Sequence, residues 1–216
     1  MARGAKVLTP SAAFGEAGAP EIERGGVAAE TLRLALQRGQ LVHRLLQTLP
    51  DIPPTQRADA ARRFLARVKP AIDPAAGEAM MTETSAVLAD AAFAPLFAVG
   101  SRAEVPIAGR ITLTGGKLVA VSGQIDRLAV SATTVLIADF KTDRNPPRHV
   151  EGIAPGYRRQ LALYRAVLTR LYPRHEIRAA VVFTQAPHLL ELPAALLDTS
   201  LADLATGRLD PPEEHT

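Results

Sequence analysis

Apolar residues recur at helical spacing in the first part of the chain. From residue 28 to 49, leucines and a valine recur at helical spacings, and the pattern stops at Pro50. Residues at these spacings share one face, so the pattern predicts an amphipathic helix. Ala-rich segments over about 56–69 and 75–90 predict two further helices, because prolines separate them.

The pattern changes to that of β-strands over residues 103–141, where Val, Ile, Thr and Leu are frequent. Gly115 and Gly116 predict a hairpin turn, since glycine tolerates the positive φ that such turns need. A second hairpin turn is expected near Ser131 and Ala132. The segment therefore predicts three consecutive antiparallel strands.

A helix over about 156–171 and a buried strand over 177–184 follow these strands. The order of helices, three strands, helix and strand predicts an α/β domain with a mixed central sheet flanked by helices. The chain of 216 residues suits one such domain, expected over 26–206. The Gly-, Ala- and Pro-rich residues 1–25 predict a flexible linker or tail, and 207–216 predict a disordered tail.

Composition excludes several kinds of chemistry. The chain has no cysteine, which excludes disulfides, zinc–thiolate sites, iron–sulfur clusters and a thiol nucleophile. The net charge is only +3, so affinity for nucleic acid must come from local placement of Lys and Arg. No membrane span or secretory signal is present in the sequence, which predicts a soluble cytoplasmic protein.

Candidate chemistry lies in the segment GQIDRLAVSATTVLIADFKTDR, residues 123–144. If the second turn is tight, with Val130 opposite Thr133, Asp126 faces Ile137 and Asp139 is its diagonal neighbour on the same face, about 7–8 Å away. Two carboxylates at that separation can share one divalent cation. Lys141 shares their face, and a register slip of one residue would separate the acids. The alternative is a structural Asp–Lys salt bridge at a sheet edge.

The sequence around these residues resembles the RecB-type nucleases of the PD-(D/E)XK superfamily. The GxxD motif matches Gly123 to Asp126, the (D/E)xK motif matches Asp139 to Lys141, and the QxxxY motif matches Gln160 to Tyr164. The strings LIADFKTDRNPP, YRRQLALYRAVL and GQLVHRLLQTLP are most similar to the AddA nuclease domain of bacterial AddAB helicase-nucleases. The resemblance covers about residues 25–205 and implies an αβββαβ restriction-endonuclease-like core with additional N-terminal helices.

The resemblance also implies a metal site and roles for its residues. Asp126, Asp139 and the main-chain carbonyl of Phe140 match the family's metal ligands, and His43 matches its helical histidine ligand. The implied cofactor is Mg²⁺, and the histidine would allow Mn²⁺ as a substitute. Lys141 would orient or help deprotonate the attacking water and stabilise the charged transition state. A core histidine that only forms a hydrogen bond is the alternative for His43.

Gln160 and Tyr164 are four residues apart on the expected helix, so their side chains share one face. They match catalytic-site positions of the family, and the alternative is a buried amide and phenol that satisfy the sheet. Glu104 aligns loosely with an acidic family position near the metal, although a surface strand glutamate is equally consistent. A further group could contact DNA phosphates or be solvated surface residues: Arg144, Arg148, Tyr157, Arg158 and Arg159.

The sequence thus predicts a magnesium-dependent deoxyribonuclease domain that cleaves single-stranded DNA in double-strand-break repair and recombination. The resemblance implies a bacterial, nucleoid-associated protein whose partners are a helicase region of the parent chain and an AddB-like subunit. The sequence has no phosphate-binding glycine–lysine loop, so the motor is expected elsewhere. The alternatives are a catalytically silent DNA-binding or scaffolding domain, and a stand-alone restriction-type endonuclease.

Overall fold

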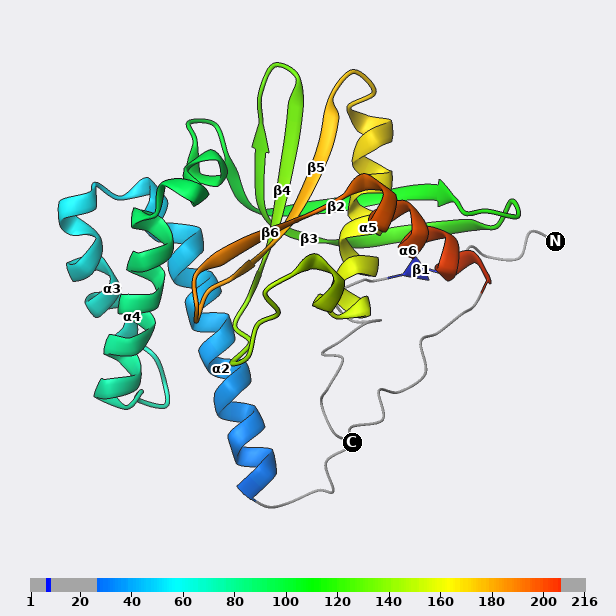
Figure 1. The fold of residues 1–216 in the computed structure, drawn as a ribbon. Helices are drawn as coiled ribbons and strands as arrows, with labels where there is room; N and C mark the ends of the chain where they lie inside the picture. Colours follow the sequence, from blue (N-terminus) through cyan, green and yellow to red (C-terminus); the bar gives the residue numbers. More distant parts are fainter. Residues whose placement is uncertain (1–6, 9–26, 207–216) are drawn as a thin grey trace.

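The computed structural model describes residues 7–8 and 27–206, which form a six-stranded mixed sheet with helices on both faces (Figure 1). The strands follow the order β1-β3-β4-β5-β6, and β2 pairs with β3. Their bounds are β1 Val7–Leu8, β2 Arg102–Thr112, β3 Leu118–Val130, β4 Thr134–Lys141, β5 Glu176–Phe183 and β6 His188–Leu192. Pairing is parallel for β1–β3 and β4–β5, and antiparallel elsewhere.

Five α-helices accompany the sheet in the described part of the chain. They are α2 Val27–Thr48, α3 Arg57–Leu65, α4 Pro74–Ala89, α5 Pro155–Leu171 and α6 Ala194–Thr206. Short 3-10 helices connect them: η1 Leu49–Asp51, η2 Pro54–Gln56, η3 Ala91–Phe97 and η4 Val150–Gly152. Helix α4 begins at Pro74, where the Asp73 side chain accepts a hydrogen bond from the Ala76 N–H at 2.9 Å and so caps the first turn.

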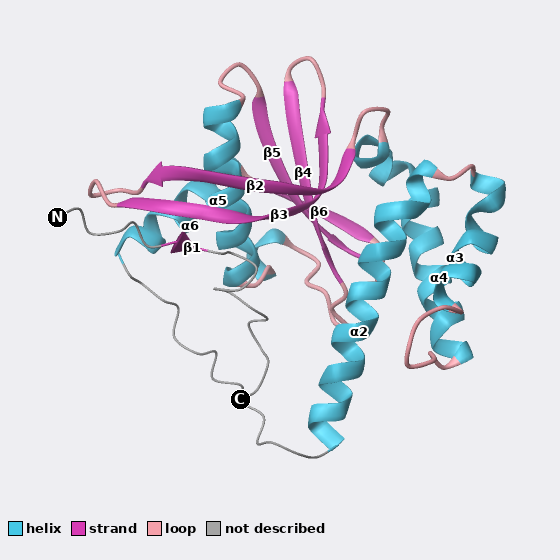
Figure 2. Ribbon diagram, turned by 180° about the vertical axis from the view of Figure 1, so that it is seen from behind, coloured by secondary structure: helices cyan, strands magenta, loops and turns pink. Residues whose placement is uncertain are grey.

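Two hydrophobic cores lie on opposite faces of the sheet. One contains α5 and α6 residues against β2, β3 and β5, and the other contains α2, α3, α4 and η3 residues. Strand β4 serves both cores because successive strand residues point to opposite faces: Val135 and Ile137 belong to the first, and Ala138 and Phe140 to the second. Figure 2 shows the two helical layers from behind, with α5 and α6 apart from α2, α3 and α4.

The predicted α/β fold is confirmed: α2, β2, β3, β4, α5 and β5 give the αβββαβ order, and α3 and α4 are the additional N-terminal helices. The sequence did not predict β6 or α6. It also did not predict β1, which lies within the expected N-terminal tail and pairs with β3 at Ala120 and Val121. The rest of that tail, and the expected tail over 207–216, lie outside the described residues.

The first predicted turn has the expected conformation, since Gly115 and Gly116 have φ values of 83° and 79°. The predicted register of the second hairpin is wrong by two residues. Val130 pairs with Val135 rather than with Thr133, because the Ser131 hydroxyl oxygen accepts the Thr134 N–H at 3.0 Å and stabilises a longer turn. A shift of two residues keeps the side chains of the paired residues 127–130 and 135–138 on their predicted faces.

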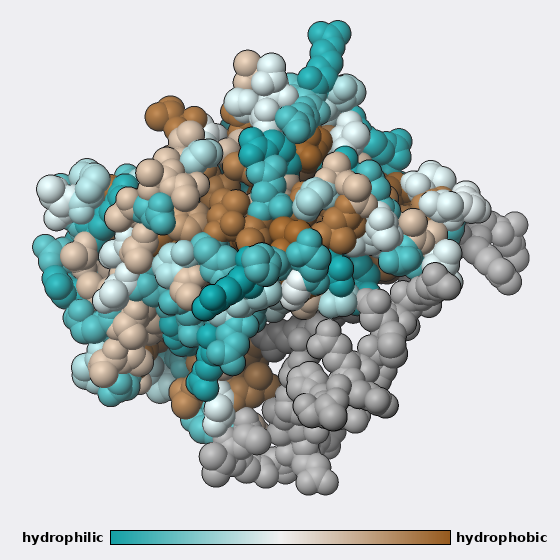
Figure 3. All heavy atoms as spheres, viewed as in Figure 1, coloured by the Kyte–Doolittle hydropathy of each residue, from teal (hydrophilic) through white to brown (hydrophobic). Residues whose placement is uncertain are grey.

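The N-terminal part of α2 extends away from the sheet (Figure 1). Leu34 and Leu36 are exposed there, and Figure 3 shows apolar surface near this end of the helix. The C-terminal part is buried through Val42, Leu45 and Leu46, which pack in the second core. The burial boundary therefore falls near Gly39 and Gln40, just before the residue His43.

Candidate active site

The candidate site lies where β3 and β4 separate. Their ladder ends at the pair Arg127–Ala138, and the next pair in that register would be Asp126 and Asp139. Instead of a ladder bond, the Asp126 Oδ2 atom accepts the Phe140 N–H at 2.7 Å. The Asp126 carboxylate thus satisfies a main-chain donor that the parting of the strands would leave unpaired. This contact fixes the acid beside β4.

Asp139 and Lys141 form the buried half of the site. The Lys141 Nζ atom lies 2.6 Å from Asp139 Oδ2, and Gln160 Nε2 donates to Asp139 Oδ1 at 2.9 Å. Lys141 Nζ also donates to Gln160 Oε1 at 3.4 Å. The structure therefore places three of the predicted catalytic residues in one hydrogen-bonded cluster between β4 and α5.

The electrostatics of this pair keep the ammonium charged. Burial tends to lower the pKa of Lys141, but the charge and hydrogen bond of Asp139 outweigh it, and the pKa lies above its ordinary value. Burial raises the pKa of the Asp139 carboxyl, with Lys141 opposing that shift and Asp126 adding to it. The Asp139 carboxylate thus favours the charged form of the Lys141 ammonium.

Tyr157 covers the same ammonium from the first turn of α5. Its ring centroid lies 4.1 Å from Lys141 Nζ, and its hydroxyl donates to Asp143 Oδ1 at 3.2 Å. Burial raises the pKa of the Tyr157 phenol to about 12. The sequence offered Tyr157 as a phosphate contact, which stays a prediction; in the structure its ring lies against the Lys141 ammonium.

Tyr164 is buried beneath β3. Its hydroxyl accepts the Gln124 N–H at 3.3 Å, on the part of β3 that β4 does not reach. Gly123 allows this approach, because a Cβ there would lie 2.4 Å from the Tyr164 hydroxyl oxygen. The contact gives a physical reason for the Gly in GxxD and the Tyr in QxxxY, and it matches the alternative of a phenol that satisfies the sheet.

A second cluster contains the groups that could hold a metal ion. His43, Glu104 and Asp126 each present one ligand atom, and these atoms all lie within 4.8 Å of one another. His43 Nδ1 is 3.5 Å from Asp126 Oδ2. An imidazole with two carboxylates suits Mn²⁺, and suits Mg²⁺ if water completes the shell. Asp139 is not a member of this group.

Glu104 is the residue that sequence reasoning left undecided. It has a φ of 52°, which is uncommon outside glycine and places it in the left-handed region. Burial raises the pKa of its carboxyl, and the neighbouring Asp126 carboxylate raises it further. A cation bound between these two neighbouring carboxylates would stabilise the charged form of Glu104. The acidic residue in AEVPI was the available sequence signal, but its backbone conformation was not.

His43 reaches this cluster from α2, which lies close to the end of β4. A Cβ on Gly39, one turn earlier, would lie 3.2 Å from Thr142 Oγ1, so the glycine permits the approach that the sequence predicted. Burial tends to lower the pKa of His43, but its hydrogen bond to Asp126 and the Asp126 charge raise the pKa overall. The His43 ring also meets the Phe140 ring edge-on, with centroids 5.9 Å apart. Whether the Phe140 carbonyl binds metal stays a prediction.

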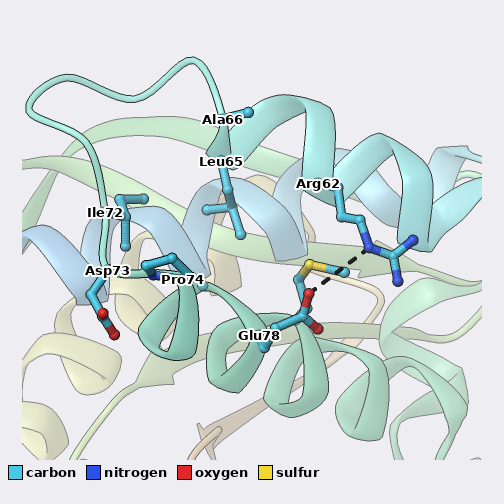
Figure 4. A pocket seen from close by; sticks show the side chains of 9 residues that line it. Arg62, Leu65, Ala66, Ile72, Asp73, Pro74 and Glu78 are labelled. Atoms are coloured by element: carbon cyan, nitrogen blue, oxygen red, sulfur yellow. Dashed lines mark ion pairs between the residues drawn. The ribbon is translucent and has the colours of Figure 1, made fainter.

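The predicted arginines lie in the first turns of α5 and in the loop that precedes it. Arg158 and Arg159 are partly buried on α5, whereas Arg144 and Arg148 are exposed in the preceding loop. A separate shallow pocket between α3 and α4 is lined by Leu65, Ile72 and Pro74 among others (Figure 4). An ion pair between Arg62 and Glu78, 3.9 Å long, crosses it. None of the predicted site residues lines this pocket.

An αβββαβ core with acids and a lysine at the point where two strands separate defines the nuclease class that the motifs indicated. The sequence profile of the PD-(D/E)XK nuclease superfamily matches residues 17–210. The chain therefore belongs to the PD-(D/E)XK nuclease superfamily. This membership makes it a nuclease-type domain and implies DNA as the substrate class.

Other comparisons add little to this assignment. No curated protein matches the chain. A solved structure titled "Crystal structure of SSO0001" is 15% identical to this chain, and the match covers 88% of this chain and 90% of that chain. Its TM-score of 0.33 is too low to establish a shared fold. Within the described residues, no helix combines the length and apolar character needed to cross a bilayer.

Proposed function

We propose that the chain is a metal-dependent deoxyribonuclease domain that hydrolyses phosphodiester bonds without a covalent enzyme intermediate. The observation that carries the proposal is the position of Asp126. Its carboxylate belongs to the His43–Glu104–Asp126 group and also contacts the Phe140 N–H, beside the Asp139–Lys141 pair. A cation-binding group and a fixed positive charge thus share one end of the sheet.

The cation group has the composition of a divalent-metal site. His43, Glu104 and Asp126 would hold the ion, and Asp139 and the Phe140 carbonyl, the other ligands that the resemblance implies, lie on the adjacent strand. A bound Mg²⁺ or Mn²⁺ would neutralise charge on the phosphate and lower the pKa of bound water. Manganese is the substitute that the imidazole favours.

Lys141 supplies the second element of the chemistry. The Asp139 carboxylate favours its charged form, in which the ammonium donates hydrogen bonds. It would orient the attacking water and stabilise negative charge in the transition state. Gln160 holds both Lys141 and Asp139 through its amide, so it acts by positioning them.

We further propose that the substrate is single-stranded DNA delivered by a helicase, as in AddAB-type enzymes of break repair and recombination. The support is the resemblance of the quoted motifs, which extends from GQLVHRLLQTLP to YRRQLALYRAVL. On this proposal, an AddB-like subunit and a helicase region are partners, and the domain acts at the bacterial nucleoid in the cytoplasm. Arg144, Arg148 and Arg158 would contact phosphates near the N-terminal end of α5.

A direct assay tests the activity. Purified protein is incubated with end-labelled single- and double-stranded DNA of equal length, in Mg²⁺, in Mn²⁺ and in chelator. We expect cleavage that requires the metal and is faster on the single strand. DNA binding without cleavage in either metal would instead support a silent binding domain. Cleavage at one duplex sequence would support a restriction-type endonuclease.

A further inference from the structure

A buried carboxylate lies outside both clusters of the site. Among the described residues, Glu83 and Asp139 are the buried acids. Burial disfavours a charged carboxylate unless other groups pair with it. Asp139 is paired with Lys141 in the site, but Glu83 lies on α4, within the helical layer on the opposite face of the sheet from α5. Its burial therefore requires a separate explanation.

Glu83 joins α2 to the end of the central strands. Its Oε2 atom forms an ion pair with Arg38 Nη2 on α2, and its Oε1 atom accepts a hydrogen bond from the Thr184 hydroxyl. Thr184 follows β5 directly, and its N–H donates to the Lys141 carbonyl at 2.9 Å. A continuous set of contacts therefore runs from α2 through Glu83 and Thr184 to the backbone of Lys141.

These contacts occur where α2 approaches the site. Gly39, next to Arg38, meets Thr142, and His43 lies one turn further along the same face, 3.5 Å from Asp126. The apolar packing of α2 through Val42 and Leu45 is non-directional, so it does not by itself fix the position of the helix along its axis. Directional bonds at Arg38 supply that restraint.

We propose that Glu83 is a positioning residue that fixes α2 against the carboxyl ends of β4 and β5, and so sets the distance between His43 and the acids of the sheet. The inference rests on the proposed metal-dependent function. Glu83 contacts neither substrate nor metal. It acts through Arg38 on the helix that carries His43, and through Thr184 on the strand end that carries Lys141.

Metal binding without DNA tests the proposal. Mn²⁺ binding is measured by calorimetry for the wild type, for Glu83→Gln, and for Glu78→Gln as the matched control. Glu78 lies on the same helix and is exposed, so the control makes the same chemical change away from Arg38. We expect the Kd of Glu83→Gln to rise roughly 10-fold or more, which is the usual effect of residues that orient metal ligands. The control should keep the wild-type Kd.

A second pair of variants leaves the buried carboxylate in place. Thr184→Val removes the hydroxyl that binds Glu83 but keeps the side-chain shape and the N–H donor to Lys141, whereas Thr184→Ser restores a hydroxyl. We expect Thr184→Val to weaken Mn²⁺ binding and Thr184→Ser to recover it. This pair decides the question if Glu83→Gln does not fold.

The helix position itself is measurable because the chain contains no cysteine. Spin labels are attached after Gln40→Cys on α2 and Leu171→Cys at the end of α5, two exposed positions. We expect the distance distribution between the labels to shift or broaden when Glu83→Gln is added, and to stay unchanged with Glu78→Gln.

The outcomes separate the two proposals. If Glu83→Gln and Thr184→Val keep both the wild-type Kd for Mn²⁺ and the wild-type label distances, the positioning role is wrong. If the wild type binds Mn²⁺ but does not cut DNA, the proposed nuclease activity fails while the positioning role is still decided by Kd and distance. If the wild type does not bind Mn²⁺, the distances between the spin labels alone decide whether Glu83 positions α2.

Discussion

The two halves of the candidate site differ in how their charges are balanced. In the buried half, Asp139 already has a cation, because Lys141 lies 2.6 Å away and Gln160 binds the other carboxylate oxygen. In the more open half, the carboxylates of Glu104 and Asp126 lie close together beside the His43 imidazole. In the first half the Asp139 carboxylate is paired with a protein cation, whereas in the second half two acids lie together and a bound cation would offset their negative charge.

On the proposed function, this difference would give the two halves separate tasks. The open half, drawn from α2, β2 and β3, would supply ligands for an ion. The buried half, drawn from β4 and α5, supplies a fixed ammonium whose pKa is raised by the Asp139 carboxylate against the effect of burial. Substitutions should therefore have different effects on metal affinity, turnover and stability according to the half in which they lie.

The largest effect is expected for Asp126→Asn in the open half. The change removes a charge from the metal group but keeps an oxygen that can accept the Phe140 N–H. Cleavage should fall by about 10³-fold or more, because a metal ion supplies several kcal/mol of transition-state stabilisation. Metal titration of the cleavage rate measures this. A variant that cuts at the wild-type rate in the same metal concentration would show that Asp126 is not a ligand.

In the buried half, Lys141→Ala should lower kcat by roughly 10²–10³-fold, the usual cost of losing a group that stabilises transition-state charge. Metal binding should persist, because Lys141 lies outside the His43–Glu104–Asp126 group. Single-turnover cleavage at saturating metal, with calorimetry of Mn²⁺ binding, separates the two effects. Lost metal affinity with normal turnover would contradict this division of tasks.

In the metal-free protein, substitutions of Asp139 and Asp126 should differ in their effect on the free energy of unfolding. Asp139→Asn leaves the buried Lys141 ammonium without its counter-charge, and should lower the free energy of unfolding by about 3 kcal/mol. Asp126→Asn relieves repulsion with Glu104 and should change it by less than about 1 kcal/mol. Urea denaturation in chelator measures both. Equal losses of unfolding free energy in the two variants would show that charge is balanced in the same way in both halves of the site.

Gly123→Ala tests the packing of Tyr164 against β3 beneath the site. The new Cβ would lie 2.4 Å from the Tyr164 hydroxyl oxygen, and Tyr164 is buried, so we expect a loss of about 1–3 kcal/mol. Gly77→Ala is the control, since the nearest atom would be 3.9 Å away and the position is helical. That change should be neutral or stabilising by up to about 1 kcal/mol. Thermal unfolding of both variants checks the contrast.

The smallest effect concerns pH and His43. Its pKa is raised in the folded protein, so its contact with Asp126 stabilises the metal-free protein at pH values below the ordinary histidine pKa. That contribution is lost as the pH rises through the folded pKa. The stability difference between wild type and His43→Ala should therefore shrink with increasing pH in chelator. A difference that is constant from pH 5 to 8 would show that the imidazole does not gain a charge interaction on folding.

Local patterns in the sequence were enough to predict most of the fold. Helical spacing of leucines predicted α2, glycines predicted the first turn, and the Val- and Ile-rich segment predicted β2 to β4. These features depend on neighbours within a few residues, so they are visible in the sequence. Strand β6 and helix α6 were missed because each depends on packing against β5 or α5, which local pattern does not reveal.

For the site too, some features follow from the sequence alone and others only from the tertiary structure. Motif spacing was sufficient to select Asp126, Asp139, Lys141, Gln160 and Tyr164 as candidates. Only the tertiary structure separated them into an ion-paired cluster, a metal-type group and a buried support, because the Ser131 turn moved the register by two residues and the strands separate before Asp126. Sequence reasoning left Glu104 open between an acid near the metal and a surface strand glutamate, and it did not select Glu83. The positive φ of one and the burial of the other are consequences of contacts between segments far apart in the chain.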